Sequence, residues 1–368
     1  MANRVTNYFE RDGKIYARIT YTDSTGKRRQ KARLAESRSD VPRVIREIED
    51  ELEKGGPDIF RHKETTLDEF LDTWLATVKQ NVRYRTYSFY EYLVEGHIRP
   101  TLGTRQLQQI RRLDVQQFVT GLREKGLSAK TVRETYQVLK RVFEQAVNWQ
   151  MRYDNPALKV EIPKKVHNEM KCLTDSEAQK FLKEALKYKW GVLFHVALKT
   201  GLRPGELLAL RWSDIDLQRK RMTVQRTLVD GENTRFAFDE PKTAKGRRTI
   251  PISDSLVALL EKHKRQQPDA PRFTHNLIFA NRNGEPLSRR ILERRYFKKI
   301  LQDVKLPNIR LYDLRHTHAT LLLLAGENPK VVSERLGHAS VAFTLDTYAH
   351  VLPSMQEQAT ERLEAILS

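Results

Sequence analysis

Residues 200–216 read TGLRPGELLALRWSDID, and this stretch decides how the C-terminal half of the chain is interpreted. It follows a predicted helix at residues 191–198, so Arg203 comes just after Gly201, where the helical segment ends. The pattern on either side of it is mixed. Helices are predicted at residues 175–187, 256–264, 288–304, 313–324, 329–336 and 341–348, and strands at 221–228, 235–238 and 247–252. This order predicts a mixed, mainly helical domain with a small antiparallel sheet.

Four other short segments carry side chains suited to chemistry on a phosphodiester. They are EPKTAKGRRTIPI at 240–252, with Lys242 and Lys245 in a polar turn; DLRHTHATLLLLAG at 313–326, with Arg315 beginning a helix; LGHAS at 336–340, with His338 after a helix end; and TLDTYAH at 344–350, with Tyr348. Guanidinium groups bind phosphate oxygens through paired hydrogen bonds. A tyrosine can act as a nucleophile and form a covalent intermediate.

Motifs for nucleotides and metals do not occur in the sequence. It contains neither a phosphate-binding loop of the G-x-x-x-x-G-K-[ST] type nor a G-x-G-x-x-G motif after a strand. His316 and His318 are two positions apart and do not share a helix face, so they do not suggest a metal site. Cys172 is the single cysteine, which excludes an internal disulfide and a cysteine-based zinc site. We expect no cofactor and no metal.

In their order and separations, these motifs resemble the motif series of the tyrosine recombinases, also called the phage integrase family. The resemblance covers residues 174–352. Residues 65–155 are similar in helical pattern to the core-binding domain of that family. Residues 1–55 resemble the small three-stranded arm-type DNA-binding domain of some phage and conjugative-element integrases. The resemblance implies a site-specific recombinase that needs no ATP and that integrates and excises a mobile element.

The resemblance also implies a role for each motif residue. Arg203 and Arg315 would clamp the scissile phosphate, and His338 would donate to a non-bridging oxygen. Tyr348 would attack phosphorus and form a 3′-phosphotyrosyl intermediate, from which a Holliday junction follows. Lys242 would protonate the leaving 5′ oxygen, and Lys245 is the alternative for this role. The carboxylate of Glu206 would orient Arg203.

One position departs from the family pattern. The family usually has histidine three residues before the second arginine, where this chain has Tyr312. A tyrosine hydroxyl has an ordinary pKa near 10, so it is a poor substitute for a neutral imidazole base. The proton acceptor for Tyr348 is therefore open, and Tyr312 is expected either to hold the phosphate or to support Arg315.

The fold class expected from these patterns is α+β and multidomain. An arm-type DNA-binding domain of three strands and a helix is expected at 1–55, a helical core-site DNA-binding bundle at 65–160 and the catalytic domain at 174–353. Linkers at 56–64 and 161–173 separate them, and an exchange helix follows at 354–368. Within the bundle, Thr66 and Ser128 are expected to cap helices. The helix at 87–103 is expected to break near Pro100 and Gly103.

The charge of the chain points to a polyanionic partner. The 368 residues include 66 lysines and arginines against 47 acids, which gives a net charge of +19 spread over all three domains. The expected DNA contacts are Lys27, Arg28, Arg29, Lys130, Arg133 and Arg141. The helix after Pro42 carries acids, among them Glu47 and Glu51, on the side expected to face away from the sheet and from DNA.

The expected partner is therefore double-stranded DNA, at core and arm-type attachment sites. The chain is expected to act as a homotetramer on DNA, with an excision factor and a host DNA-bending protein as further partners. The N-terminus lacks the apolar stretch of a signal peptide, and no apolar run is long enough to span a bilayer. A bacterial cytosolic, nucleoid-associated protein without membrane contact is expected.

Two other functions fit parts of the sequence. A type IB topoisomerase would share the phosphotyrosine, but relaxation of DNA needs no separate arm-binding domain. A DNA-binding regulator could use residues 327–348, ENPKVVSERLGHASVAFTLDTY, as a helix-turn-helix, but would not need Arg203, Lys242 or Tyr348. The C-terminal helix, with Met355, Ala359, Leu363 and Ile366 on one face, would dock either on its own catalytic domain or on a neighbouring protomer.

Overall fold

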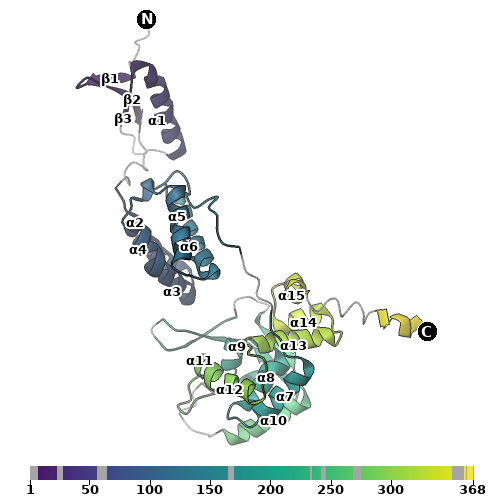
Figure 1. Cartoon of the computed structure of the whole chain (residues 1–368). Helices are drawn as coiled ribbons and strands as arrows, with labels where there is room; N and C mark the ends of the chain where they lie inside the picture. Colours follow the sequence, from purple (N-terminus) through teal and green to yellow (C-terminus); the bar gives the residue numbers. More distant parts are fainter. Residues whose placement is uncertain are drawn as a thin grey trace. The chain divides into compact units, whose positions relative to one another are not determined.

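The computed structural model describes residues 7–22, 28–55, 64–164, 170–232, 234–241, 246–267, 275–349, 360–361 and 363–367. It divides into two units, Met1–His167 and Asn168–Ser368 (Figure 1). Within the described residues, no helix combines the length and the apolar character that crossing a membrane requires.

The N-terminal part of the first unit is a three-stranded antiparallel sheet with one helix against it. The elements are β1 (Tyr8–Arg11), β2 (Lys14–Thr22), β3 (Arg28–Ala35) and α1 (Val41–Gly55), with the strands in the order β1-β2-β3. Ala17 and Ala35 of the sheet are buried against Val44 and Ile48 of the helix. Small residues at these sheet positions leave room for the apolar side of α1.

The register of the sheet places Arg29, Lys31 and Arg33 of β3 on one face and Arg28 on the other. Lys31 pairs with Ile19 and lies on the face that α1 covers. There it forms an ion pair with Glu51, and Arg33 pairs with both Glu47, at 3.3 Å, and Glu51. The expectation that these two acids face away from the sheet is therefore wrong. They neutralise Lys31 and Arg33 on the face that α1 covers.

The rest of the described first unit is a bundle of helices. They are α2 (Leu67–Asn81), α3 (Tyr84–Leu93), the π-turn Val94–Ile98, α4 (Arg99–Leu102), the 3-10 turn Leu107–Gln109, α5 (Arg112–Glu124) and α6 (Ala129–Asn148). Thr66 and Ser128 cap α2 and α6 as predicted, and Thr66 does so in a capping box with Glu69. The predicted break at Pro100 is wrong, because the wider π-turn carries the helix through this residue. The helix ends at Leu102, next to Gly103, as predicted.

The second unit begins with three helices, α7 (Asp175–Ala185), α8 (Gly191–Thr200) and the short α9 (Pro204–Leu208). Strands follow in a β4-β5-β8 sheet and a β6-β7 hairpin: β4 (Ile215–Asp216), β5 (Arg221–Val224), β6 (Thr227–Val229), β7 (Ala237–Asp239) and β8 (Arg248–Pro251). The strand predicted at 221–228 is thus two strands in two sheets. Helix α9 was not predicted, because five residues are too few to show a helical period.

The remaining helices of the second unit match the predicted ranges closely. They are α10 (Asp254–Gln266), α11 (Arg289–Ile291), the π-turn Leu292–Phe297, α12 (Lys298–Asp303), α13 (Asp313–Leu324), α14 (Pro329–Leu336) and α15 (Val341–Thr347). The expected α+β class with small antiparallel sheets is confirmed. Of the C-terminal tail, residues 360–361 and 363–367 are described as helical, with Leu363 and Ile366 exposed. Met355 and Ala359 lie outside the described residues, so the docking of this helix stays a prediction.

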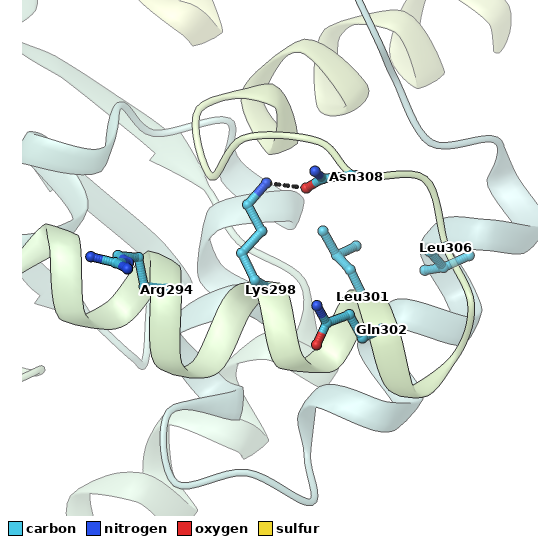
Figure 2. Close-up of a pocket in the computed structure, with 6 residues that line it drawn as sticks. All are labelled: Arg294, Lys298, Leu301, Gln302, Leu306 and Asn308. Atoms are coloured by element: carbon cyan, nitrogen blue, oxygen red, sulfur yellow. Dashed lines mark hydrogen bonds between the residues drawn. The ribbon is translucent and has the colours of Figure 1, made fainter.

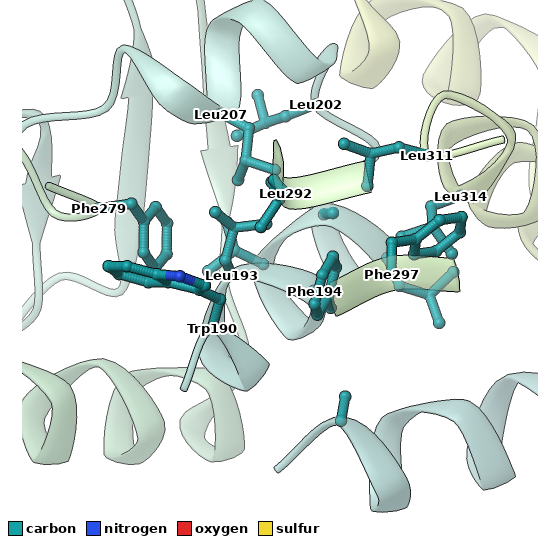
Figure 3. Close-up of a cluster of buried hydrophobic side chains, with 14 of the residues drawn as sticks. Trp190, Leu193, Phe194, Leu202, Leu207, Phe279, Leu292, Phe297, Leu311 and Leu314 are labelled. Carbon is teal, nitrogen blue, oxygen red and sulfur yellow. The ribbon is translucent and has the colours of Figure 1, made fainter. Parts of the chain in front are cut away.

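The core of the second unit is built around α8. At the start of this helix, Phe194 packs with Phe297 and Leu314, whereas Trp190 lies beside Phe279 (Figure 3). The rings of Phe194 and Phe297 lie 5.7 Å apart. This packing holds the end of α8 beside α13, and the motifs at Gly201 and Arg315 lie on these two helices.

Candidate active site

Arg315 is the most deeply buried of the predicted phosphate ligands. It lies in the first turn of α13 with 1% of its surface exposed. Its Nη1 donates to the Gly201 carbonyl at 2.8 Å and its Nη2 to the Leu336 carbonyl at 2.7 Å. Burial and the positive charge of Arg203 lower the pKa of Arg315 to about 10. The guanidinium remains charged at neutral pH and is fixed by backbone carbonyls rather than by a carboxylate.

Gly201 makes the turn that brings the first motif to Arg315. It ends α8 in the left-handed region, with φ of 67°. A Cβ at this position would lie 2.5 Å from Cδ2 of His318 and 2.7 Å from Cδ2 of Leu336. Only glycine satisfies both the backbone angle and the close approach of α13 and α14.

Arg203 is the N-cap residue of helix α9, and Glu206 lies in the first turn of this helix. Nη1 of Arg203 donates to Oε1 of Glu206 at 2.8 Å, and its Nη2 donates to the Gly337 carbonyl at 3.1 Å. Glu206 is 3% exposed and also receives Nη2 of Arg248 at 2.9 Å. Burial raises the pKa of Glu206, but the hydrogen bond from Arg248 and the charges of both arginines outweigh it, so the pKa is lowered. Glu206 is therefore an anion held between two arginines.

Arg248 was not predicted from the sequence. It is the first residue of strand β8, and its Nε donates to the Arg335 carbonyl at 2.7 Å. This hydrogen bond connects the sheet to the end of α14. The doublet Arg247–Arg248 in the segment 240–252 was the available signal. Lys242 and Lys245 of the same segment lie outside the described residues, so the choice between them stays a prediction.

His338 follows the left-handed Gly337 at the end of α14. Its Nδ1 lies 2.7 Å from Oγ1 of Thr344, and its ring meets Phe343 edge-on at 4.9 Å. Burial and the charges of Arg315 and Arg203 lower the pKa of His338 to about 3. The imidazole is therefore neutral at physiological pH. When the Thr344 hydroxyl donates to Nδ1, the proton of the ring is on Nε2, free to be donated to an oxygen.

Tyr348 ends α15 and is almost fully buried, with 1% of its surface exposed. Burial raises the pKa of its hydroxyl, although the nearby charge of Arg315 opposes this. The hydroxyl lies 3.0 Å from Nδ1 of His316. The ring of Tyr312 contacts the ring of His316 edge-on, with the two ring centroids 5.2 Å apart.

His316 is thus a second residue that the sequence interpretation missed. It was considered only as a metal ligand with His318, and the two side chains point to different partners. His318 donates from Nδ1 to the Leu198 carbonyl at 2.8 Å and accepts from Nε of Arg335 at 3.2 Å. Burial, and then the charge of Arg335, lower the pKa of His318 to about 3. Among the residues that the structure describes, no three metal-binding side chains gather.

A shallow hollow on the same unit lies apart from these residues. Lys298 donates a hydrogen bond to the side-chain oxygen of Asn308 at this hollow (Figure 2). The lining residues are Arg294, Lys298, Leu301, Gln302, Leu306 and Asn308. None of the predicted catalytic residues lines it.

Comparison with known families matches residues 170–355, half of the chain, to the phage integrase family. The chain belongs to this family. Residues 66–123 match a second description, the SAM-like N-terminal domain of phage integrases. The predicted family, the tyrosine recombinases, is confirmed, and with it the enzyme class: the protein is a site-specific DNA recombinase.

Two similar proteins come from bacterial genomes. The tyrosine recombinase XerC-like of Caldanaerobacter subterraneus subsp. tengcongensis is 32% identical, over 97% of this chain and 98% of that protein. The ICEBs1 integrase of Bacillus subtilis is 31% identical, over 81% of this chain and 82% of that protein.

Solved integrase structures share the fold. The Tn1549 transposon integrase in complex with a circular intermediate DNA has a TM-score of 0.70 at 24% identity, covering 81% of this chain and 99% of that one. A lambda integrase dimer bound to a COC′ core site has a TM-score of 0.59 at 20% identity, covering 94% of this chain and 95% of that one.

The predicted DNA contacts of this integrase belong to the first unit, and the predicted catalytic residues belong to the second. Arg28 and Arg29 are exposed on β3, whereas Lys27 lies outside the described residues. On α6, Lys130 is exposed and 3.8 Å from Glu134. Two other side chains on this helix have partners: Arg133 donates to the Pro163 carbonyl at 2.8 Å, and Arg141 donates to the Tyr90 hydroxyl and lies over its ring.

Proposed function

We propose that Tyr348 of this integrase attacks the scissile phosphate of DNA, forms a 3′-phosphotyrosyl bond and frees a 5′ hydroxyl. One observation carries the proposal: both predicted phosphate ligands converge on the end of α14. Arg203 donates to the carbonyl of Gly337 and Arg315 to that of Leu336, and His338 is the next residue. Two cations and a neutral imidazole therefore surround one short backbone segment.

This cluster is suited to the charge that develops on phosphorus oxygens during attack. Arg203, 37% exposed at its side chain, can reach a phosphate while Glu206 holds it, and His338 can donate from Nε2. Positive charge fixed in advance costs no reorganisation during reaction, and losing one such donor typically costs about 10²–10³ in rate. Tyr312 lies against His316 and supports the nucleophile's surroundings, in place of acting as a base.

The leaving 5′ oxygen needs a proton, which we assign to Lys242 or Lys245. The 5′ hydroxyl of a second duplex then attacks the phosphotyrosine, so that bond energy is conserved and ATP is not needed. Exchange between two duplexes uses four protomers and passes through a Holliday junction. The reaction would integrate and excise a mobile element in the bacterial cytosol, with an excision factor and a host DNA-bending protein setting its direction.

The N-terminal domain, residues 1–55, would bind arm-type DNA through the sheet face that α1 leaves open. By register, Tyr16 and Arg18 of β2 lie on this face. Phe9 of β1 stacks on Tyr16 at 5.3 Å and lies under Arg18 at 5.7 Å. Aromatic and basic side chains on an open sheet suit contact with DNA. The bundle at 65–160 would hold the core site, with linkers at 56–64 and 161–173.

Covalent capture on a nicked suicide DNA tests the function. The wild-type protein should accumulate a protein–DNA adduct, and Tyr348→Phe should bind the same DNA without forming it. An adduct with the Phe variant would refute the assignment, and binding without any wild-type adduct would favour a regulator. Recombination of two sites, against relaxation of a supercoil alone, separates a recombinase from a topoisomerase.

The tail would act between protomers. Leu363, Ile366 and Leu367 are 57%, 79% and 75% exposed, so an apolar surface is available to a neighbour. Deleting residues 354–368 should leave binding to a single site unchanged and reduce recombination of paired sites. If the shortened protein recombines at the wild-type rate, the tail does not link protomers.

A further inference from the structure

The family pattern places a histidine three residues before Arg315, and this chain has Tyr312 there. The structure offers another imidazole for the same task. Nδ1 of His316 lies 3.0 Å from the hydroxyl of Tyr348, within direct hydrogen-bond reach of the atom that attacks phosphorus. We propose that His316 is the general base of this integrase and accepts the proton of Tyr348. This inference rests on the proposed role of Tyr348 as the nucleophile.

The position of His316 follows from the start of α13. Tyr312 and His316 are four residues apart, so their side chains are neighbours on one side of the helix. The two rings meet edge-on at 5.2 Å, and the ring of Tyr348 meets His316 from the other direction at 5.8 Å. The imidazole thereby contacts two aromatic rings. Its neighbour Arg315 lies on another side of the helix, where its guanidinium reaches the Gly201 carbonyl.

Tyr348 needs such a partner more than an exposed tyrosine would. Its hydroxyl is buried and its pKa is raised, so the fraction ionised at neutral pH is very small. When the imidazole of His316 is neutral and carries its proton on Nε2, its Nδ1 accepts a hydrogen bond from the hydroxyl. As the bond from Oη to phosphorus forms, the proton moves to Nδ1 and the bond from phosphorus to the 5′ oxygen breaks. The leaving oxygen takes its proton from the lysine of the segment 240–252.

Other titratable groups near this pair are less suited to accept the proton. Tyr312 is a phenol, and His338 has its Nδ1 occupied by Thr344 and a pKa lowered to about 3. Cys172, which contributes to the electrostatics at Tyr348, has a raised pKa because it is buried. Arg315 carries a positive charge and cannot accept a proton. Among these described groups, His316 has the 3.0 Å hydrogen-bond distance to the Tyr348 hydroxyl.

Single-turnover cleavage of suicide DNA by the full chain tests the proposal, with His316→Ala and His316→Asn compared at saturating protein. Asn keeps an acceptor oxygen near the position of Nδ1 but cannot hold a proton. Both variants should bind DNA normally and cleave at least about 100-fold more slowly, the usual contribution of a general base. Their rates should rise about tenfold per pH unit between pH 6 and 9, because only ionised Tyr348 reacts. The wild-type rate should depend less steeply on pH over the same range, because the imidazole takes up the proton.

A second substrate separates the base from the acid. DNA with sulfur in place of the bridging 5′ oxygen has a leaving group that needs no proton, so it should rescue Lys242→Ala or Lys245→Ala, whichever is the acid. It should not rescue either His316 variant. Rates within threefold of wild type, restoration by Asn, or rescue by the sulfur substrate would each overturn the role of His316 as the base. The wild-type adduct at Tyr348 is measured in the same series, and its absence would instead refute the proposed function.

Discussion

The guanidinium of Arg315 donates to the backbone carbonyl of Gly201 at 2.8 Å, a hydrogen bond between residues 114 positions apart in the chain. The carbonyl can be reached because Gly201 turns the backbone into the left-handed region at the end of α8. The same turn leads directly to Arg203. One glycine therefore sets the relative position of both phosphate-binding arginines.

Replacing Gly201 with alanine should destabilise the second unit by about 2–4 kcal/mol, since a left-handed alanine is strained and its Cβ overlaps His318 and Leu336. Urea unfolding measures the change. Gly121→Ala in α5 is the control, because nothing lies within 4 Å of its Cβ and alanine favours a helix. Equal effects of the two changes would mean that the close packing at Gly201 relaxes without cost.

Glu206→Gln keeps the shape of the side chain but removes the anion between Arg203 and Arg248. Removing one partner of a buried ion pair typically lowers the free energy of unfolding by about 3–5 kcal/mol. Because the amide of Gln retains an oxygen, we expect a loss of about 2–3 kcal/mol here. Suicide-substrate cleavage should fall as Arg203 loses its fixed position, while affinity for duplex DNA is kept. Unchanged cleavage would mean that the carbonyl of Gly337 alone suffices to hold Arg203.

Acid should weaken the second unit through His318. Its pKa is about 3 in the folded protein against an ordinary value of 6.5, so the unfolded chain binds the extra proton first. The contribution of neutral His318 to the free energy of unfolding is fully present above about pH 6.5. It is lost as the pH falls toward 3, at about 1.4 kcal/mol per pH unit. Urea unfolding at pH 7 and pH 5 should show a smaller loss for His318→Asn than for the wild type, by about 2 kcal/mol. Equal losses would exclude His318 as a source of the pH dependence.

Tyr312→Phe should slow cleavage less than about tenfold, within the 0.5–1.5 kcal/mol of one hydrogen bond, because the ring against His316 is kept. Tyr312→Ala should slow it more, because the imidazole loses that contact. Single-turnover cleavage of both variants gives the comparison. A loss beyond a hundredfold for the Phe variant, with intact folding, would show that the hydroxyl itself takes part in the reaction.

The open face of the N-terminal sheet predicts a difference between two arginines of equal charge. Arg18 lies over Phe9 on the open face, whereas Arg46 is exposed on α1 behind the sheet. Arg18→Ala should weaken binding to arm-type DNA at least tenfold, and Arg46→Ala should change it less than threefold. Binding of full-length protein to arm and core fragments measures both. If the two variants lose affinity equally, the sheet face does not make the contact.

The sequence was sufficient for what depends on local pattern. Helical period and caps placed α2, α6 and the helices from α10 to α15, and the motif order identified the family. The contacts of the site depend on distant parts of the chain and were not visible. His316 reaches Tyr348 across 32 positions, and Arg248 reaches Glu206 across 42. Likewise, no local pattern shows that Glu47 and Glu51 would meet the basic residues of β3, because the register of the sheet decides it. The catalytic roles of the motif residues stay predictions.

The burial of Tyr348 has a consequence for the cell that houses this recombinase. With 1% of its surface exposed, the side chain that would break DNA offers almost no surface to a phosphate, so DNA binding must expose it while His316 stays within reach. A single protomer that meets chromosomal DNA in this state should therefore bind it without nicking it. Cleavage would then be confined to the assemblies on DNA in which the Tyr348 side chain becomes accessible to the phosphate.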